Sequence, residues 1–341
     1  MRALVAGHLC IDFFPEMDSA PGLVEGALFA IGPMQARPGG CVYTTGRTLI
    51  ALGIDTEIAA SVGRDALSAL LLGLCGEAGL DVDGLTEVDA STSYTIVSQP
   101  RGRDRTFWHH LGANEYFDGR DLDLGHVDLL HVGYPNLMAQ LYVDDGDRLV
   151  ELFRRAKDAG CATSVDLAVI DISDADRVPR WQRFFDRVLP WTDVISPSVD
   201  DLSGMLDWPT EAPTPESLAR AAQRLLQWGV AVVLVTGGTA GLHVATGGAD
   251  RLNRTGRLAP LLLGRSDLAH HEPAQRVLHV SGTTGAGDVA TAGFLAGLLS
   301  GAGPVGAAGW AARAAARHVS GRAAWDPILT DPTDDEGDPK P

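Results

Sequence analysis

Lysine is nearly absent from this 341-residue chain. Only Lys157 and Lys340 are present, and arginine supplies the rest of its 27 basic residues. A Schiff-base enzyme needs a reactive lysine, and a P-loop NTPase needs one after a glycine-rich loop, yet no G-x-x-x-x-G-K-[ST] motif occurs. The sequence therefore argues against both classes.

Cysteines and long apolar runs are also few. The 4 cysteines lie too far apart in the sequence for a zinc motif, and a disulfide framework is not typical of so long a chain. No apolar run reaches the roughly 18 residues of a membrane span. Asp12 interrupts the apolar start of the chain, which we interpret as a buried strand rather than a signal peptide. We therefore expect a cytoplasmic protein without a membrane partner.

The charge balance is acidic. Acidic residues outnumber basic ones by 44 to 27, which gives a net charge of −17. A general nucleic-acid binder needs a basic surface to displace phosphate counterions, so this balance argues against a nucleic-acid partner. Hydrophobic residues make up 45% of the chain, which allows a large core and excludes global disorder.

Strand and helix patterns alternate along most of the chain, which predicts a parallel sheet covered by helices on both faces. The strand patterns cover residues 2–7, 56–62, 127–132, 162–165, 194–195 and 231–236. The helical patterns cover residues 39–52, 65–79, 145–159, 198–206, 214–227, 286–299 and 305–320. A hairpin is predicted at 93–110 and a strand at 27–31, and together these could form a small second sheet. Residues 247–276 show no regular pattern.

The strongest chemical signal is the loop Gly282-Thr283-Thr284-Gly285-Ala286-Gly287-Asp288 at the start of a predicted helix. The backbone N–H groups of Gly285, Ala286 and Gly287 would lie uncapped at the positive end of the helix dipole, which makes an anion site without a lysine. Asp288, in the first helical turn, is either a helix cap or a general base that deprotonates a hydroxyl group.

Motifs along the whole chain resemble those of the ribokinase-like (pfkB) carbohydrate kinases, in the order of that family. The resemblance spans about residues 2–325. The motifs are G-H-L-C-I-D at 7–12, P-G-G at 38–40, V-G-R-D at 62–65, G-R-D-R-T-F at 102–107, G-A-N at 112–114, T-G-G-T-A-G at 236–241 and G-T-T-G-A-G-D at 282–288.

The resemblance implies a Rossmann-like three-layer α/β/α fold with a small β lid. The core would comprise residues 1–12, 39–89 and 113–327 and the lid residues 13–38 and 90–112, with a disordered acidic tail at 328–341. In relatives such lids often pair between subunits, so a homodimer is expected.

The resemblance also implies transfer of the γ-phosphate of ATP to a primary hydroxyl of a sugar or sugar acid, with Mg²⁺. Asp288 would be the base, and Gly285, Ala286 and Gly287 the anion hole. The substrate-binding candidates are Asp12, Gly39, Gly40, Thr44, Arg105 and Asn114. The ATP-side candidates are Ser198, Thr236, Gly238, Gly241, Thr283, Ala312 and Ala316.

Three positions depart from the family pattern. Gly282 replaces an aspartate that helps relatives to bind an activating monovalent cation, so this cation is in doubt. Ser198 and Asp201 stand where the family has N-x-x-E, and Asp201 would organise Mg²⁺ through water. Thr44 replaces an asparagine that commonly touches the sugar.

Several alternatives stay open. Asp12 could cap a strand end, Asn114 could serve a turn, Arg105 could be a solvated charge, and the alanines at 312 and 316 could serve helix packing. A nucleoside kinase of the same family would use Phe107 or Trp108 as a shelf for the base. A non-catalytic sensor of sugar or nucleotide is the third function considered. An NAD-dependent dehydrogenase is disfavoured, because the first turn lacks G-x-G-x-x-G.

Overall fold

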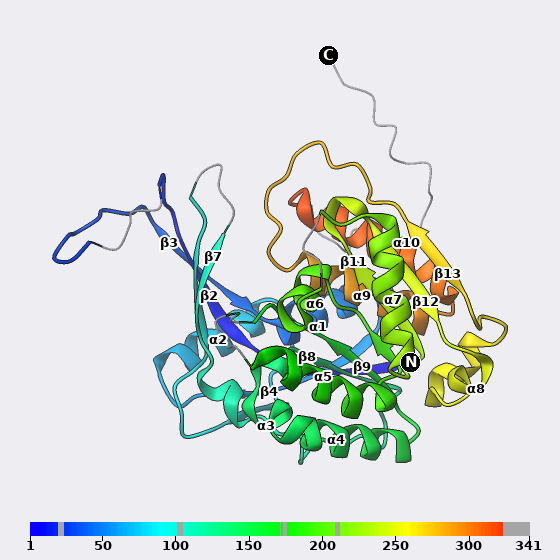
Figure 1. Ribbon diagram of the computed structural model, residues 1–341. Helices are drawn as coiled ribbons and strands as arrows, with labels where there is room; N and C mark the ends of the chain where they lie inside the picture. Colours follow the sequence, from blue (N-terminus) through cyan, green and yellow to red (C-terminus); the bar gives the residue numbers. More distant parts are fainter. Residues whose placement is uncertain (20–23, 101–104, 171, 173–175, 209–211, 323–341) are drawn as a thin grey trace.

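Two β-sheets organise the computed structural model, which describes residues 1–19, 24–100, 105–170, 172, 176–208 and 212–322 (Figure 1). The larger sheet has nine strands among the described residues, in the order β13-β12-β11-β10-β9-β8-β1-β4-β5. Their bounds are β1 Arg2–Gly7, β4 Asp55–Val62, β5 Leu85–Glu87, β8 Leu129–Gly133, β9 Ala162–Asp166, β10 Val194–Ile195, β11 Val232–Thr236, β12 Leu242–Thr246 and β13 Ala269–Glu272.

The sheet is parallel from β11 to β5, as predicted, but its other edge is antiparallel. Strand β12 returns antiparallel to β11 after a short 3-10 turn at Gly238–Ala240, and β13 pairs antiparallel with β12. The pattern of the sequence missed both strands. Strand β13 reads Ala-His-His-Glu, without the β-branched residues that signal a strand, so only its pairing with β12 defines it.

Helices cover both faces of the large sheet, which confirms the three-layer α/β/α prediction. One face carries α1 Cys41–Ala51, α2 Ala66–Glu77, α9 Ala286–Leu299 and α10 Gly303–Val319. The other carries α3 Ala139–Tyr142, α4 Asp147–Asp158, α5 Arg177–Val188, α6 Val199–Leu206 and α7 Pro215–Gln227. The short α8 Ala249–Leu252 and the 3-10 segment Gly256–Leu262 fill the region for which no pattern was found. Helix α5 was not predicted.

The smaller sheet, which we call the lid, has the strand order β3-β2-β6-β7 and projects from the body of the molecule (Figure 1). Its strands are β2 Cys10–Pro15, β3 Met34–Gly39, β6 Tyr94–Ser98 and β7 Thr106–His110. The predicted hairpin is confirmed as β6 and β7. The strand predicted at 27–31 is wrong, because the strand that pairs with β2 lies at 34–39. Strand β2 starts earlier than the predicted lid boundary at residue 13, which places Asp12 on the lid. The acidic tail at 328–341 lies outside the described residues.

Helix α9 is buried along almost its whole length and packs closely against α10 through glycines. A Cβ atom on Gly297 would lie 2.7 Å from the Cα of Ala307, and one on Gly293 would lie 3.0 Å from the Cα of Ala311. Glycine at these positions lets the two helix backbones approach each other, which fixes the helix that begins at Gly285. None of the helices in the described part of the chain is both long and apolar enough to span a membrane.

We expect Gly297→Ala to lower the free energy of unfolding by about 2 kcal/mol, because overpacking a helix contact forces the backbones apart. The matched control is Gly73→Ala, inside α2, where no atom lies within 4 Å of the added Cβ. The control should stabilise the protein slightly, since alanine favours a helix over glycine. Denaturant unfolding of both variants measures the difference. Equal stabilities would contradict the packing argument.

Candidate active site

Asp288 lies in the first turn of α9, and its side chain is buried, with 4% exposed. Gly285 caps the helix with φ 79°, a left-handed conformation that glycine adopts without strain, and no side chain caps the helix. The N–H of Ala286 donates to the Thr283 carbonyl at 3.2 Å, so this amide, predicted to be free, is engaged within the loop. The N–H groups of Gly285 and Gly287 have no hydrogen-bond partner among the described residues. These two amides can receive an anion.

Tyr134 contacts Asp288 directly, and sequence reasoning missed this residue. Its hydroxyl donates to both carboxylate oxygens, at 2.8 and 2.9 Å. The residue directly follows β8, at the carboxyl edge of the sheet where open α/β folds bind ligands. That position was the available signal, because no motif of the sequence includes Tyr134.

Carboxylates gather around Asp288. Its pKa is raised to about 7, mainly by burial and also by the charges of Asp12 and Asp201, although the Tyr134 hydrogen bond lowers it. Burial also raises the pKa of Asp201 to about 7 and that of Asp166 well above its usual value. Asp166 accepts from the Leu167 N–H at 2.8 Å and from the Thr291 hydroxyl at 3.2 Å. A proton acceptor near neutral pH therefore lies beside the loop amides.

Asp201 and its neighbour Asp166 suit a hydrated divalent cation. No group of three histidine, cysteine or acidic side chains within the described ranges could hold a metal ion directly. The charge of Asp201 nevertheless raises the pKa of Asp166, so these two buried carboxylates interact. Mg²⁺ keeps several of its waters in proteins and uses few carboxylates. The residues present suit Mg²⁺ held through water.

Asp12 faces the same region from the lid. Burial raises its pKa, and the Cys10 thiol donates to it at 3.3 Å. Gly39, on the neighbouring strand, leaves space for the Asp12 side chain in this position, because a Cβ there would lie 2.2 Å from a carboxylate oxygen of Asp12. The predicted pair of Asp12 and Gly39 is thus brought together, and the electrostatic effect of Asp12 reaches Asp288.

Two histidines that were not predicted join the lid to the body. The Nε2 atoms of His8, after β1, and His109, on β7, lie 3.1 Å apart, and the Nδ1 of His109 lies 3.0 Å from the Thr95 hydroxyl. Burial lowers the pKa of His109 to about 4 and that of His8 well below its usual value. One ring must therefore donate and the other accept, with both neutral. Gly40 allows this arrangement, since a Cβ there would lie 2.6 Å from Nδ1 of His8.

Arg105, just before β7, extends toward the loop at 282–287, which is predicted to bind an anion and which we call the phosphate loop. Its guanidinium donates to the Thr283 hydroxyl and lies over the Phe107 ring, 5.5 Å from the centroid. Successive residues of a strand face opposite sides of the sheet. Phe107 therefore lies on the same side of the lid as His109, which faces the body, and Trp108 lies on the side that faces away from the body. The lid thus places a cation and an aromatic ring beside the loop.

Asn114 fastens the chain after β1. Its side-chain amide accepts from the Leu9 N–H and donates to the Leu9 carbonyl, both at 3.1 Å, and the residue is fully buried. Both ends of the amide therefore hold the backbone of Leu9. Thr44 lies near the phosphate loop, because a Cβ on Gly285 would be 3.3 Å from its methyl group.

Ser198 and Asp201 form a capping box at the start of α6. The Ser198 hydroxyl and N–H both donate to one oxygen of Asp201, at 2.6 and 2.8 Å, and the Asp201 N–H donates back to the hydroxyl at 3.1 Å. Ser198 also forms an isolated bridge with Thr236, at the end of β11. These contacts bring together three residues predicted for the nucleotide and metal.

The remaining nucleotide-side residues lie around the β11–β12 turn and α10. Gly238 and Gly241 have φ of 57° and 84°, and a Cβ on Gly241 would lie 2.4 Å from the Glu272 carbonyl. Ala312 is buried in the core that α9 and α10 share, so packing accounts for it, whereas Ala316 is half-buried. His318, also on α10, contacts the Thr284 carbonyl through Nε2 at 2.8 Å.

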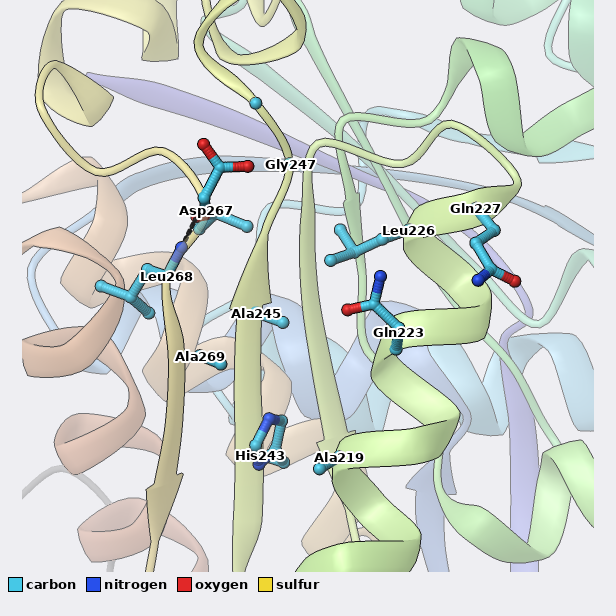
Figure 2. Close-up of a pocket in the computed structure, with 12 residues that line it drawn as sticks. Ala219, Gln223, Leu226, Gln227, His243, Ala245, Gly247, Asp267, Leu268 and Ala269 are labelled. Carbon is cyan, nitrogen blue, oxygen red and sulfur yellow. Dashed lines mark hydrogen bonds between the residues drawn. The ribbon is translucent and has the colours of Figure 1, made fainter.

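A cavity of about 430 Å³ lies away from these residues, between α7 and the β12–β13 edge (Figure 2). Gln223 and Gln227 line it from α7, and His243 and Ala245 from β12. The cavity extends to Gly247 and Asp267, past the C-terminal end of β12. The β11–β12 turn lies at the other end of that strand. None of the predicted site residues lines the cavity.

A three-layer body, a β lid and a buried carboxylate at a small-residue helix start define the ribokinase-like class of proteins. Residues 2–330 match the pfkB family of carbohydrate kinases, and the chain belongs to that family. It is therefore a kinase of the sugar and nucleoside kinase group. No curated protein matched the sequence.

Solved structures support the same fold. The ribokinase of Arabidopsis thaliana, in complex with ribose and ATP, has a TM-score of 0.71 and 21% identity over 93% of this chain and 92% of its own. The ribokinase of Thermotoga maritima has a TM-score of 0.69 and 21% identity, with the same coverage of each chain. A nucleoside kinase of Burkholderia thailandensis, in complex with inosine, has a TM-score of 0.66 and 16% identity over 95% of this chain and 93% of its own.

The low pKa of buried His8 predicts a loss of stability in acid. The unfolded chain takes up a proton as the pH falls below about 6.5, whereas folded His8 stays neutral. Each such group lowers the free energy of unfolding by about 1.4 kcal/mol per pH unit below that point. His8→Gln should make the slope between pH 6 and 4 shallower by this amount, and His126→Gln, on the surface, serves as the control. Identical slopes for His8→Gln and the unsubstituted protein would contradict the assignment.

Proposed function

We propose that the protein is an ATP-dependent kinase that phosphorylates a primary hydroxyl of a sugar or sugar acid. The observation that carries the proposal is the position of Asp288, whose pKa is raised to about 7 by burial, beside the free amides of Gly285 and Gly287. A base that takes up a proton near neutral pH suits the deprotonation of an alcohol. Amides at a helix start suit the charge of a transferred phosphoryl group.

In the reaction, an acceptor hydroxyl gives its proton to the Asp288 carboxylate as its oxygen bonds to the γ-phosphorus. The bond from that phosphorus to the bridging oxygen breaks, and its electron pair stays on ADP. Such transfer depends mainly on positioning and on charge stabilisation. The amides of Gly285 and Gly287 stabilise the phosphoryl oxygens, and Arg105 adds a positive charge from the lid. Asp12 accepts hydrogen bonds from other hydroxyls of the acceptor.

The nucleotide would lie between the β11–β12 turn and α10, with its phosphates at the loop before α9. Thr236, Gly238, Gly241, Thr283 and Ala316 border that space. Mg²⁺, held through water by Asp201, would neutralise phosphate charge when bound. Closing the lid would exclude water, which otherwise competes with the acceptor as a nucleophile.

A nucleoside is the second candidate acceptor. Phe107 is exposed by 41% and lies on the side of the lid that faces the body, where a base could stack on it. Trp108, the other predicted shelf, lies on the opposite side of the strand. A sugar and a nucleoside would be phosphorylated by the same reaction. They differ only in the part of the acceptor that the lid would cover.

The side of the lid that faces away from the body, which we call its outer side, supports a homodimer. Met34 and Trp108 lie on that side and are exposed by 50% and 53%, and the lid sheet has two unpaired edges, β3 and β7. A small sheet with an apolar face and open edges gains stability when a second copy covers it. We infer that the lids of two subunits pair through this side.

Asp288→Asn should lower kcat by about 10²–10⁴-fold, the usual contribution of a general base. The assay measures ADP release with Mg²⁺·ATP across sugars, sugar acids and nucleosides, and the best acceptor defines the substrate class. Asp200→Asn, an exposed acid on α6, is the control and should keep full activity. An active Asp288→Asn variant would overturn the mechanism. Binding of ATP without turnover of any acceptor would favour a sensor.

Light scattering should give about twice the chain mass of 35.9 kDa at micromolar concentration. Trp108→Glu places a charge on the outer side of the lid and should shift the protein toward the monomer. Leu263→Glu, at an exposed site outside the lid, should leave the dimer intact. A monomer without substitution removes the dimer proposal.

A further inference from the structure

The contact between Tyr134 and Asp288 is the most direct side-chain interaction of the base. The phenol hydroxyl donates to both carboxylate oxygens, at 2.8 and 2.9 Å. We propose that Tyr134 is a positioning residue, which holds the Asp288 carboxylate ionised and oriented toward the acceptor hydroxyl. The inference rests on the proposed function, in which Asp288 is the base.

The chain around Tyr134 fixes its hydroxyl in place. Tyr134 has φ 62°, a left-handed backbone conformation that residues other than glycine rarely adopt. Its N–H donates to the Asp166 carbonyl at 3.0 Å, and its carbonyl accepts from Leu137 at 2.9 Å. Its ring lies 5.6 Å from that of His8, centroid to centroid. Strain at a residue that packing and backbone hydrogen bonds hold in place is typical of functional sites.

The surroundings of Asp288 explain why it needs such a donor. The charged and titratable groups that interact with it are Asp12 and Cys10 on β2, Cys41 on α1, Asp166 on β9, Asp201 on α6 and Tyr134 itself. The three other carboxylates disfavour its charge, and so does burial. The Tyr134 hydroxyl, with a smaller contribution from Thr45, acts in the opposite direction.

The Tyr134 contact does not use every hydrogen-bonding position of the Asp288 carboxylate. A carboxylate has about four lone-pair positions, and the shared Tyr134 proton occupies one on each oxygen. A second position on either oxygen stays available to the acceptor hydroxyl. Burial and the Asp288 charge raise the pKa of Tyr134 well above its usual value, so it remains a donor at every pH of interest. Tyr134 therefore orients the base without itself exchanging the proton.

The test compares Tyr134→Phe with Tyr142→Phe, the same change on α3, where the ring packs against Trp181. In the active protein, kcat/KM should rise with pH as Asp288 ionises near pH 7. Loss of the donor raises the pKa of Asp288, so the acid limb of Tyr134→Phe should move up by about one pH unit. At pH 6.5 this corresponds to about a tenfold loss of kcat/KM, with recovery to within about threefold at pH 9. The control should keep the profile of the unsubstituted protein.

A second readout does not depend on activity. Carbon-13 NMR of the aspartate carboxyls, in the protein without metal or nucleotide, follows the titration of Asp288, which Asp288→Asn assigns. Tyr134→Phe should raise its midpoint, and Tyr142→Phe should not. An unchanged midpoint and pH profile in Tyr134→Phe would overturn the inference even if the kinase is active. If no acceptor is phosphorylated, the proposed function fails, while the NMR titration still tests the contact.

Discussion

The site depends on one constraint, which is the burial of an ionisable carboxylate at the start of a helix that is itself buried. Helix α9 can occupy the interior because its glycines let α10 approach closely, and this packing fixes the direction in which the helix begins. The helix dipole and the Tyr134 hydroxyl favour the charged form of Asp288, whereas burial and neighbouring acids oppose it. The balance places its pKa near neutrality. Core packing and the pKa of Asp288 are therefore set by the same helix.

The lid is part of the same electrostatic arrangement. Asp12 lies on β2, yet its charge acts on Asp288 at the start of α9. The neutral pair of His8 and His109 joins the lid to the body, and Arg105 reaches Thr283 in the phosphate loop. Each contact links the two sheets at the carboxyl edge of the larger one. Movement of the lid would thus change the polarity of the acceptor region as well as its access to water.

Much of the fold followed from the sequence, because it rests on local signals. The alternation of strand and helix patterns indicated the three-layer architecture, and the small-residue run before α9 indicated the phosphate loop. The edge strands β12 and β13 were missed, since pairing rather than composition defines β13. The strand at 34–39 was placed too early in the chain, because it contains Pro38 and few residues that favour strands.

The sequence alone determined the family and placed Asp288 in the first turn of a helix after a small-residue loop, because these features belong to contiguous motifs. Only the tertiary structure decided which side chains surround that carboxylate. Tyr134 and Thr45 contact Asp288 from segments far from residue 288 in the sequence, and no local pattern marks them. The structure also shows that the Asn114 amide fastens the Leu9 backbone and that the Ala286 N–H is engaged within its own loop. Contacts between distant segments arise from the packing of the two sheets, which no single stretch of sequence contains.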